Sequence, residues 1–379
     1  MLIPLTITLI IYIPYALLIL VLLRGWHRNP SAGITTGSSE PRTKLSVVVA
    51  FRNEASRIHP LLKSLTKQDY PDDSMEVLLV NDHSEDSSGA AARHWAGRQS
   101  FEARVLQNGG DEKGKKAALT RGIQEATGEL IVTTDADCAM GPGWLTSITR
   151  YYEQHPADMI ASPVMFDYDR RKFFEKFQAL ELLTLVATTA GSIGARRALF
   201  CNAANMAFRR SAFLRLNDPF VSRTASGDDT MLLQKIKATD NLTIAFNAGR
   251  ESVVTTAPAQ NIRSFWNQHK RWVSKSRHYK DRDILGAGLI VFCANLWLTL
   301  LLLGAPLSHT FLLLLGPTFA FKALLDLLLL RPAVGYFAKK ALWKIYLPAQ
   351  AVYPLYSTLT AILGRSSGFT WKNRNYHVN

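Results

Sequence analysis

Two carboxylates, Asp135 and Asp137, are the residues of this chain best suited to chemistry. They follow residues 129–132 almost directly, an apolar run that predicts a buried strand. A strand that ends in Asp-x-Asp presents both side chains at its carboxyl end, where α/β sheets hold ligands. Hard oxygen ligands at this spacing suit Mg²⁺ or Mn²⁺, which can bridge a diphosphate. A bare Asp-x-Asp is more often a solvated loop, so the metal site predicted at Asp137 and Asp135 depends on its neighbours.

The elements around these carboxylates alternate between strand and helix. Residues 45–51 and 75–80 are apolar runs typical of buried strands, and residues 54–67 and 115–126 have the spacing of helices. Such an alternation predicts an α/β domain whose largely parallel sheet carries helices on both faces.

Polar side chains follow each of these strands. Asn53 and Glu54 come after the first strand, and Asp82 comes after the second. Because ligand sites in open α/β sheets gather at the carboxyl ends of strands, we expect these residues to share a site with Asp135 and Asp137. A turn residue is an equally good explanation of Asp82 when it is considered alone.

Apolar segments at both ends of the chain predict attachment to a membrane. Residues 1–23 contain no charged residue, no Lys or Arg precedes them and no Ala-x-Ala site follows them, so we expect an anchor and not a cleaved signal peptide. Residues 284–304 and 307–330 predict two further transmembrane helices. Residues 341–364 are also apolar but carry two prolines, which would permit a re-entrant segment where protein covers the freed backbone groups.

Lys322 and Asp326 lie four residues apart within the third of these segments. An intrahelical ion pair that faces other helices is the simpler explanation of the two charges. A role in handling a membrane-embedded substrate is the alternative.

The net charge of +14 is concentrated beside the apolar segments. Nucleic acid is one possible reason for such a charge, but the predicted spans make an anionic lipid surface the better one, and we expect no nucleic-acid partner. The positive-inside rule then places the middle of the chain in the cytoplasm, as in an integral protein of a bacterial inner membrane. The basic residues that flank the first two spans are Arg24, Arg28, Lys270, Arg271, Lys275, Arg277, Lys280 and Arg282.

Three scattered cysteines, Cys138, Cys201 and Cys293, fit a reducing compartment and offer no metal-ligand spacing. Residues 259–280 predict an amphipathic helix that lies on a membrane surface, packs under the predicted α/β domain, or does both. Its apolar stripe consists of Ile262, Phe265, Trp266, His269, Trp272 and Val273.

Seven motifs occur in an order that resembles family 2 of the glycosyltransferases, the membrane-attached inverting enzymes of GT-A fold. The resemblance covers about residues 44–282. The motifs are residues 46–54, Val80-Asn81-Asp82, the Gly-Lys-x-x-Ala-Leu run at 114–119, Asp135-Ala136-Asp137, the acceptor-side segment 200–210, Gly227-Asp228-Asp229, and the Gln-x-x-Arg-Trp motif at 268–272.

One motif departs from the family pattern. The family's Glu-Asp pair is here Asp228-Asp229. The shorter first side chain makes Asp229 the better candidate for the general base and leaves Asp228 with a supporting role. A general base of this kind contributes roughly 10²- to 10⁴-fold to the rate.

The resemblance implies roles for the other motif residues. Asp137 would hold a divalent ion, Mg²⁺ or Mn²⁺, with Asp135 nearer the ribose and uracil. The donor-binding residues would be Asn53, Glu54, Asp82, Lys115, Asp135, Gln268, Arg271 and Trp272. The acceptor-side residues would be Cys201, Asn202 and Trp272.

The function that these features imply is inverting transfer of a sugar from a nucleotide-diphosphate donor, expected to be a UDP-sugar, to a hydroxyl of a membrane lipid or lipid-linked acceptor at the cytoplasmic face. The ending at residues 369–374 looks like the tails of ceramide and carotenoid lipid glycosyltransferases. A processive exopolysaccharide synthase is one alternative, although three or four spans are too few to build a translocation channel. A non-catalytic membrane scaffold is the other alternative.

The expected organisation places a GT-A catalytic domain between transmembrane helices at both ends of the chain. We expect an outside amino terminus, three full spans and a fourth segment that dips in and returns; four spans with an outside tail are the alternative. The predicted parts are an N-terminal transmembrane helix at 1–23, a linker at 24–43, the catalytic domain at 44–258, the interface helix at 259–283, membrane segments at 284–364 and a basic tail at 365–379.

Overall fold

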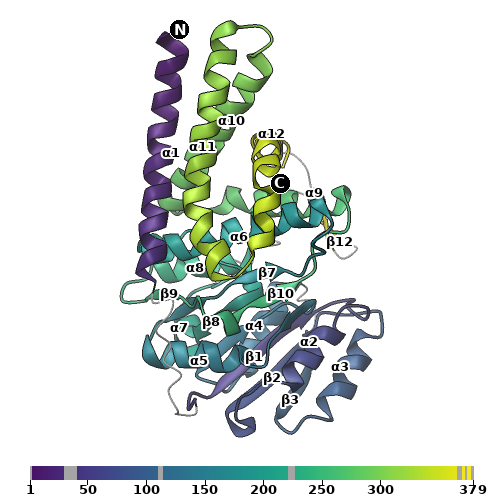
Figure 1. Ribbon diagram of the computed structural model, residues 1–379. Coiled ribbons are helices and arrows are strands. Elements are labelled where there is room, and N and C mark those ends of the chain that lie inside the picture. The colour runs from purple at the N-terminus through teal and green to yellow at the C-terminus, as the bar shows by residue number, and fades with distance from the viewer. Residues whose placement is uncertain are drawn as a thin grey trace. The chain divides into compact units, whose positions relative to one another are not determined.

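The computed structural model describes residues 2–29, 41–109, 114–220, 227–364, 369–371 and 374–376, so most of the predicted linker and tail lies outside it. Two units divide the chain, and each is described here by itself (Figure 1). The sheet unit consists of Asn29–Asp167 and Ala198–Ala257. The membrane unit consists of Met1–Arg28, Tyr168–Arg197 and Pro258–Asn379.

The main sheet of the sheet unit has the strand order β3-β2-β1-β4-β8-β6-β9. The pairs from β3 to β4 are parallel, β8 is antiparallel to both of its neighbours, and β6 pairs in parallel with β9. This confirms the largely parallel sheet. The strands are β1 (Leu45–Phe51), β2 (Met75–Asn81), β3 (Glu102–Gln107), β4 (Leu130–Thr133), β6 (Met159–Ala161), β8 (Met206–Arg209) and β9 (Ile244–Phe246).

Every residue of β1, β2 and β4 is buried, which explains why these strands read as continuous apolar runs and not as alternating ones. Helix α4 packs against β1 and β2, and α3 packs against β3. A second sheet has the order β5-β10-β7. The remaining elements of this unit are α2 (His59–Thr66), η1 (Asp72–Ser74), α3 (Ser88–Ala96), α4 (Lys115–Glu125), β5 (Cys138–Met140), α5 (Trp144–Gln154), β7 (Val164–Phe166), η2 (Ala203–Asn205), α7 (Arg210–Arg215), α8 (Asp228–Lys237), η3 (Arg250–Ser252) and β10 (Val254–Thr256).

Helix α2 begins five residues later than the helix expected at 54–67. Glu54 starts a separate turn, in which its carbonyl accepts hydrogen bonds from the backbone N–H groups of Arg57 and Ile58 at 2.8 and 2.9 Å. Pro60 lies in the first turn of α2, where its missing N–H leaves no bond unmade. Residues 54–58 are therefore a loop at the carboxyl end of β1 and not the first turns of α2.

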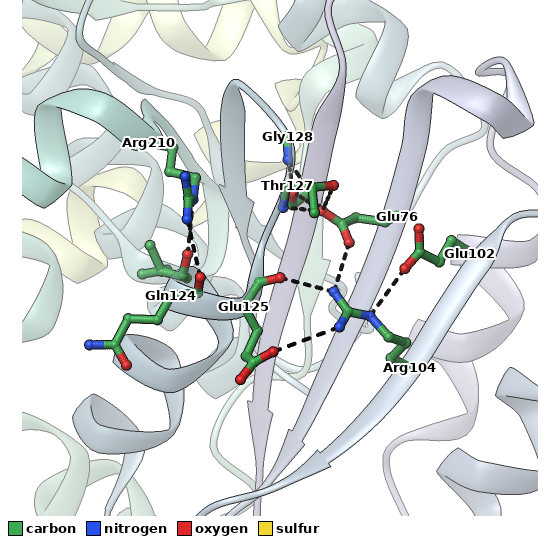
Figure 2. A network of polar contacts seen from close by, with 10 residues as sticks. Glu76, Glu102, Arg104, Gln124, Glu125, Thr127, Gly128 and Arg210 are labelled. Carbon is green, nitrogen blue, oxygen red and sulfur yellow. Dashed lines mark hydrogen bonds and ion pairs between the residues drawn. The ribbon is translucent and has the colours of Figure 1, made fainter.

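A buried carboxylate fastens the segment that leads into β4 (Figure 2). Glu76 on β2 is fully buried and accepts hydrogen bonds from Ser46 Oγ at 2.5 Å and from the backbone N–H groups of Thr127 and Gly128 at 2.6 and 3.2 Å. Arg104 on β3 completes the network, with its Nη2 at 3.1 Å from Glu76 Oε2. The network fixes where β4 begins, and β4 ends at the predicted metal motif.

In the described part of the chain, three helices of the membrane unit are long and apolar enough to cross a membrane, which confirms the expected spans (Figure 1). Each runs longer than its apolar stretch because polar residues continue the helix. They are α1 (Leu2–Arg28), α10 (Arg282–Gly304) and α11 (His309–Tyr336). The other elements are α6 (Phe173–Gly194), α9 (Ile262–Ser274), η4 (Lys275–His278), η5 (Lys340–Ile345), α12 (Tyr346–Leu363), β11 (Phe369–Trp371) and β12 (Arg374–Tyr376).

Helix α6 comes from the middle of the chain but packs within the membrane unit, against α1 and α11. Gly25 of α1 and Gly191 of α6 permit the closest approach. A Cβ added at Gly25 would lie 1.8 Å from the carbonyl oxygen of Gly191, and one at Gly191 would lie 2.4 Å from that of Leu22. Two glycines therefore let the backbones of α1 and α6 touch.

Lys322 and Asp326 form an ion pair at 2.7 Å inside the membrane unit. Lys322 is 1% exposed, and it also reaches Gln350 Oε1 on α12 at 3.2 Å. Tyr15 of α1 donates a hydrogen bond to Asp326. The pair therefore joins three helices, which is what the structural explanation of these charges requires.

Candidate active site

The metal motif lies in the turn between two strands of different sheets. Strand β4 ends at Thr133, and β5 begins at Cys138. The side chains of Asp135 and Asp137 are each 36% exposed, so their oxygens are accessible from solvent. Burial first, and then the two neighbouring carboxylates, raise the pKa of Cys138 well above its ordinary value, which keeps this thiol protonated. The two carboxylates, and not a thiolate of Cys138, are therefore the negatively charged groups of this turn.

Lys115 connects the metal motif to the Asp228-Asp229 pair, which contains the predicted general base. Its Nζ lies 2.7 Å from Asp135 Oδ1 and 3.1 Å from Asp228 Oδ2. Burial alone would lower the pKa of Lys115, but the two carboxylates raise it above its ordinary value. Lys115 is the first residue of α4, and Gly114 before it has a φ of 108°, which a residue with a side chain rarely adopts.

Asp228 and Asp229 are the first two residues of α8, and Gly227 before them has a left-handed φ of 96°. Their exposed fractions are only 6% and 8%. The partial positive charge at a helix N-terminus is favourable for carboxylates in this position. Asp229 Oδ1 accepts a hydrogen bond from the backbone N–H of Thr230 at 2.6 Å.

The acceptor-side loop predicted from sequence meets Asp229 directly. Asp229 Oδ2 lies 3.4 Å from the backbone N–H of Ala203, in the turn η2. Asn202 caps that turn, with its Oδ1 accepting from the N–H of Ala204 at 3.0 Å. Cys201 just before it is buried. The structure therefore brings the candidate base and the candidate acceptor loop together.

The strand-end residues Glu54 and Asp82 are both 2% exposed and are held by protein groups. Asp82 Oδ1 accepts from the N–H of Gly114 at 2.9 Å and from Asn108 Nδ2 at 3.2 Å. Glu54 Oε2 pairs with Arg57 Nε at 3.0 Å. Both carboxylates thus organise the loops around the site.

Asn53 has a φ of 50°, an uncommon backbone conformation for a residue with a side chain. Its Oδ1 accepts a hydrogen bond from the N–H of Glu85 at 2.9 Å. The side chain therefore fastens the loop that follows β2. A donor contact from Asn53 remains a prediction.

The two-carboxylate motif fits a divalent ion that is completed by its ligand. Among the residues that the structure describes, no group of three or more His, Cys, Asp or Glu side chains could hold a metal ion by itself. Mg²⁺, and by its similar preference for oxygen Mn²⁺, is commonly held by one or two carboxylates together with substrate phosphates and water. Asp135 and Asp137 supply such a pair. Lys115 contacts Asp135, and Arg57 Nη1 lies 3.7 Å from Asp137 Oδ2, so cationic side chains already neutralise these carboxylates.

Gln268, Arg271 and Trp272 all lie on α9, which belongs to the membrane unit. A capping box formed by Asn261 and Ser264 starts this helix. Within the described residues, the buried Gln268 Oε1 has no hydrogen-bond partner. A donor contact from Gln268 remains a prediction.

Sequence reasoning missed three residues that organise the site. Arg57 links Glu54 to Asp137, and its three-residue spacing from Glu54 was a usable signal. Asn108 follows β3 as Asp82 follows β2, so the strand-end rule would have found it had the mixed-charge strand been recognised. The backbone N–H of Ala203 carries no signal in the sequence.

A scan against protein-family models matches residues 46–216 to the model described as Glycosyl transferase family 2. The chain carries a family 2 glycosyltransferase domain. The matched segment contains β4, α4 and all of β1 except Leu45, and with them Lys115, Asp135 and Asp137. Asp228, Asp229 and the α9 motif lie beyond its end.

Curated relatives of this family 2 domain are transferases. The chain is 27% identical to Glycosyltransferase AglE of Haloferax volcanii over 124 residues, which cover 33% of this chain and 40% of that protein. It is 25% identical to Beta-monoglucosyldiacylglycerol synthase of Nostoc sp. over 235 residues, 60% of this chain and 48% of that one. With Dodecaprenyl-phosphate galacturonate synthase of Rhizobium johnstonii it shares 30% identity over 128 residues, 33% and 37% of the two chains. The chain therefore spans less than half the length of each of these relatives.

Among solved structures, the chain resembles a mannosyltransferase from Pyrobaculum calidifontis in complex with GDP-Man and Mn²⁺. The TM-score is 0.58 at 22% identity, and the match covers 93% of this chain and 98% of that one. At this identity the likeness concerns the fold. The sheet unit accordingly has the GT-A fold that the sequence predicted.

Proposed function

We propose that this protein is an inverting glycosyltransferase that moves a sugar from a nucleotide-diphosphate donor to a hydroxyl of a membrane lipid or lipid-linked acceptor at the cytoplasmic face. The observation that carries the proposal is the direct linkage, through Lys115, of the metal motif inside the family 2 match to Asp228 of the Asp228-Asp229 pair beyond it. A degenerate scaffold would have no reason to keep these buried and semi-buried charges in mutual contact, because such charges are costly.

Two relatives support a lipid acceptor by name, one through diacylglycerol and one through dodecaprenyl phosphate. Three helices that are long and apolar enough to cross a membrane also support an acceptor that resides in a membrane. A UDP-sugar is our proposed donor, and a GDP-sugar is the variant that the Pyrobaculum structure supports.

Asp229 carries the acid–base chemistry in this proposal. Its Oδ2, beside the acceptor-side loop, accepts the proton of the acceptor hydroxyl while that oxygen bonds to the anomeric carbon. The bond from the anomeric carbon to the diphosphate oxygen breaks, and the diphosphate leaves with the electron pair. A single displacement of this kind inverts the anomeric centre. Asp228 holds Lys115 in place beside Asp229.

Asp137 and Asp135 would hold Mg²⁺ or Mn²⁺, which supplies positive charge to the leaving diphosphate. Lys115 contributes further positive charge at the same turn. Arg271 can form paired hydrogen bonds to phosphate and Trp272 can stack in the acceptor mouth, and both assignments rest on the Gln-x-x-Arg-Trp motif. Gln268, Asn53, Glu54 and Asp82 are proposed on the donor side, and Cys201 and Asn202 on the acceptor side.

The basic residues of α9 and η4 are proposed to attract an anionic lipid surface, each contributing about 1 kcal/mol. With the sheet unit in the cytoplasm, the short loop between α10 and α11 lies outside. A cysteine at Ser308 in that loop should react with a membrane-impermeant maleimide added outside sealed vesicles, above the background of the native cysteines. Reaction only from the cytoplasmic side would overturn the proposed orientation.

A donor screen tests the function itself. The purified full chain in lipid nanodiscs is mixed with UDP- and GDP-hexoses, lipid extract and either Mn²⁺ or EDTA, and glycosylated lipids are read by mass spectrometry. We expect a metal-dependent product that Asp137→Ala abolishes. Asp72→Ala, at an exposed carboxylate of η1, is the matched control and should retain activity. If no donor yields transfer or hydrolysis under any condition, the scaffold alternative holds.

A further inference from the structure

His269 lies in the middle of α9 and is buried between two other helices of the membrane unit. It is 5% exposed. Its Nε2 lies 3.1 Å from Oε2 of Glu181 on α6, whose side chain is 11% exposed. Its ring lies 5.4 Å from the ring of Tyr356 on α12. One side chain of α9 therefore contacts both helices against which α9 packs.

The hydrogen-bond geometry determines how many protons this pair holds. His269 Nδ1 is 2.9 Å from the backbone carbonyl oxygen of Phe265, which can only accept, so Nδ1 carries a hydrogen. Nε2 faces a carboxylate oxygen of Glu181. Without another proton, two lone pairs would face each other. One proton therefore lies between His269 and Glu181.

Aromatic side chains surround the pair. The rings of Phe265 and Trp272 lie 4.2 and 4.6 Å from the imidazole, and Tyr356 provides a third aromatic contact. Two titratable side chains of α12, Tyr353 and Tyr356, lie near the pair, while Lys270 and Arg271 follow His269 on α9 itself.

Fixing His269 also fixes the direction of its neighbours. A helix turns about 100° per residue, so Arg271 projects about 200° away from His269, on the opposite face of α9, and Gln268 projects about 100° away. His269 and Phe265 are the buried residues in this stretch, while Gln268, Arg271 and Trp272 are half-buried. The orientation of the motif residues therefore depends on which face of α9 is held down.

We propose that His269 and Glu181 are positioning residues of the transferase. Their shared proton fastens α9 to α6 and so sets the direction of Gln268 and Arg271. The proposal rests on the proposed function in one respect, the assignment of Arg271 to the donor. The anchoring of α9 can be measured without any substrate.

Hydrogen–deuterium exchange of residues 262–274, in the full chain in nanodiscs, is the direct measurement. Glu181→Ala leaves the buried Nε2 of His269 without its hydrogen-bond partner, so we expect the protection factors of α9 to fall by at least about 10-fold. Glu181→Gln keeps the shape, and its amide N–H can donate to neutral His269. Glu175→Gln, which alters a more exposed ion pair on α6, is the control and should change nothing.

Glu181→Gln separates hydrogen bonding from simple packing. It keeps the shape of the side chain and a donor toward His269, so we expect close to wild-type protection of α9. Unchanged protection in Glu181→Ala would overturn the proposal, and so would a loss of protection in Glu181→Gln as large as that in Glu181→Ala. If Glu181→Ala does not fold, the comparison of Glu181→Gln with wild type still decides, because a large loss of protection in Glu181→Gln would overturn the proposal.

The donor KM tests whether the contact between His269 and Glu181 affects donor binding. We expect Glu181→Ala to raise the donor KM by at least about 10-fold with a smaller change in kcat, in the same direction as Arg271→Ala. A loosened α9 with an unchanged donor KM would overturn the positioning role and leave the proposed function intact. Exchange results as expected, without transfer from any donor, would instead overturn the proposed function and leave the anchor standing.

Discussion

Substitution of Glu76 tests how the site's strand is held in place. Glu76 is fully buried and accepts hydrogen bonds from Ser46, Thr127, Gly128 and Arg104 (Figure 2). Burial alone would raise the pKa of Glu76, but these hydrogen bonds lower it below the ordinary value of 4.5. The ionised carboxylate is therefore the form that the fold selects.

The expected loss in the free energy of unfolding follows from the hydrogen bonds that Glu76 accepts. Hydrogen bonds to a charged group are worth about 1.5–3 kcal/mol, against about 0.5–1.5 kcal/mol for neutral ones. Glu76→Gln makes its remaining bonds neutral and sets its amide N–H against Arg104, so we expect a loss of about 3 kcal/mol. Glu76→Ala leaves several buried donors without an acceptor and should cost about 3–5 kcal/mol. At about 2–4 °C per kcal/mol for a unit of this size, a loss of 3–5 kcal/mol lowers Tm by roughly 6–20 °C.

The assay is thermal unfolding of the full chain in detergent, followed by intrinsic fluorescence. Glu102→Gln is the matched control, because Glu102 pairs with the same Arg104 but has a side chain that is 52% exposed. We expect that variant to change stability by less than about 1 kcal/mol.

The pH dependence has a definite sign. Because the folded-state pKa of Glu76 is lowered, its contribution to stability is fully present above the unfolded value of 4.5 and is lost as pH falls through the folded pKa. The gap in Tm between wild type and Glu76→Gln should therefore be constant near neutral pH and narrow below about pH 4.5. Equal effects of the Glu76 and Glu102 substitutions, or a gap that widens in acid, would refute the reasoning.

Three further predictions concern the base and the membrane unit. Asp229→Asn should lower kcat by about 10²- to 10⁴-fold with donor affinity nearly unchanged in equilibrium binding; a larger loss in the Asp228 counterpart would reverse the roles. Gly25→Ala should cost about 1–3 kcal/mol by overpacking, measured by thermal unfolding, whereas Gly286→Ala, where a Cβ meets nothing within 4 Å, should not destabilise. Lys322→Met alone should destabilise by about 3–5 kcal/mol, and adding Asp326→Leu should restore most of it. A restored fold without sugar transfer would favour the acceptor-handling role for this pair.

Much of the fold was predictable because its signals are local. Strands β1, β2 and β4 are buried on both faces, so they appear in the sequence as continuous apolar runs. The long uncharged stretches in α1 and α10 likewise predict membrane spans from the local sequence, because a segment that crosses a bilayer must be long and apolar. Asp82 and Asp135 could be assigned to one edge of the sheet because parallel strands end together.

Other features depended on partners distant in the chain. Lys115 is a turn-and-helix residue in the sequence, and only the folded sheet unit places it between Asp135 and Asp228. Helix α6 comes from the middle of the chain, yet its glycine contact with α1 puts it in the membrane unit. No periodicity encodes either arrangement, because periodicity reports which face of an element is buried and not what buries it.

His269 shows most clearly which features the sequence predicts and which depend on the tertiary structure. Its place on an apolar stripe of residues 259–280 was visible in the sequence and correctly indicated a packed side chain. The sequence did not indicate that the ring nitrogen of His269 contacts Glu181, 88 residues earlier. The position of a carboxylate on a largely apolar helix does not identify the residue with which it pairs. The sequence by itself determined which segments are strands, helices and spans and which residue types lie at strand ends; the tertiary structure alone decided which charges neutralise one another, since that requires distances across the fold.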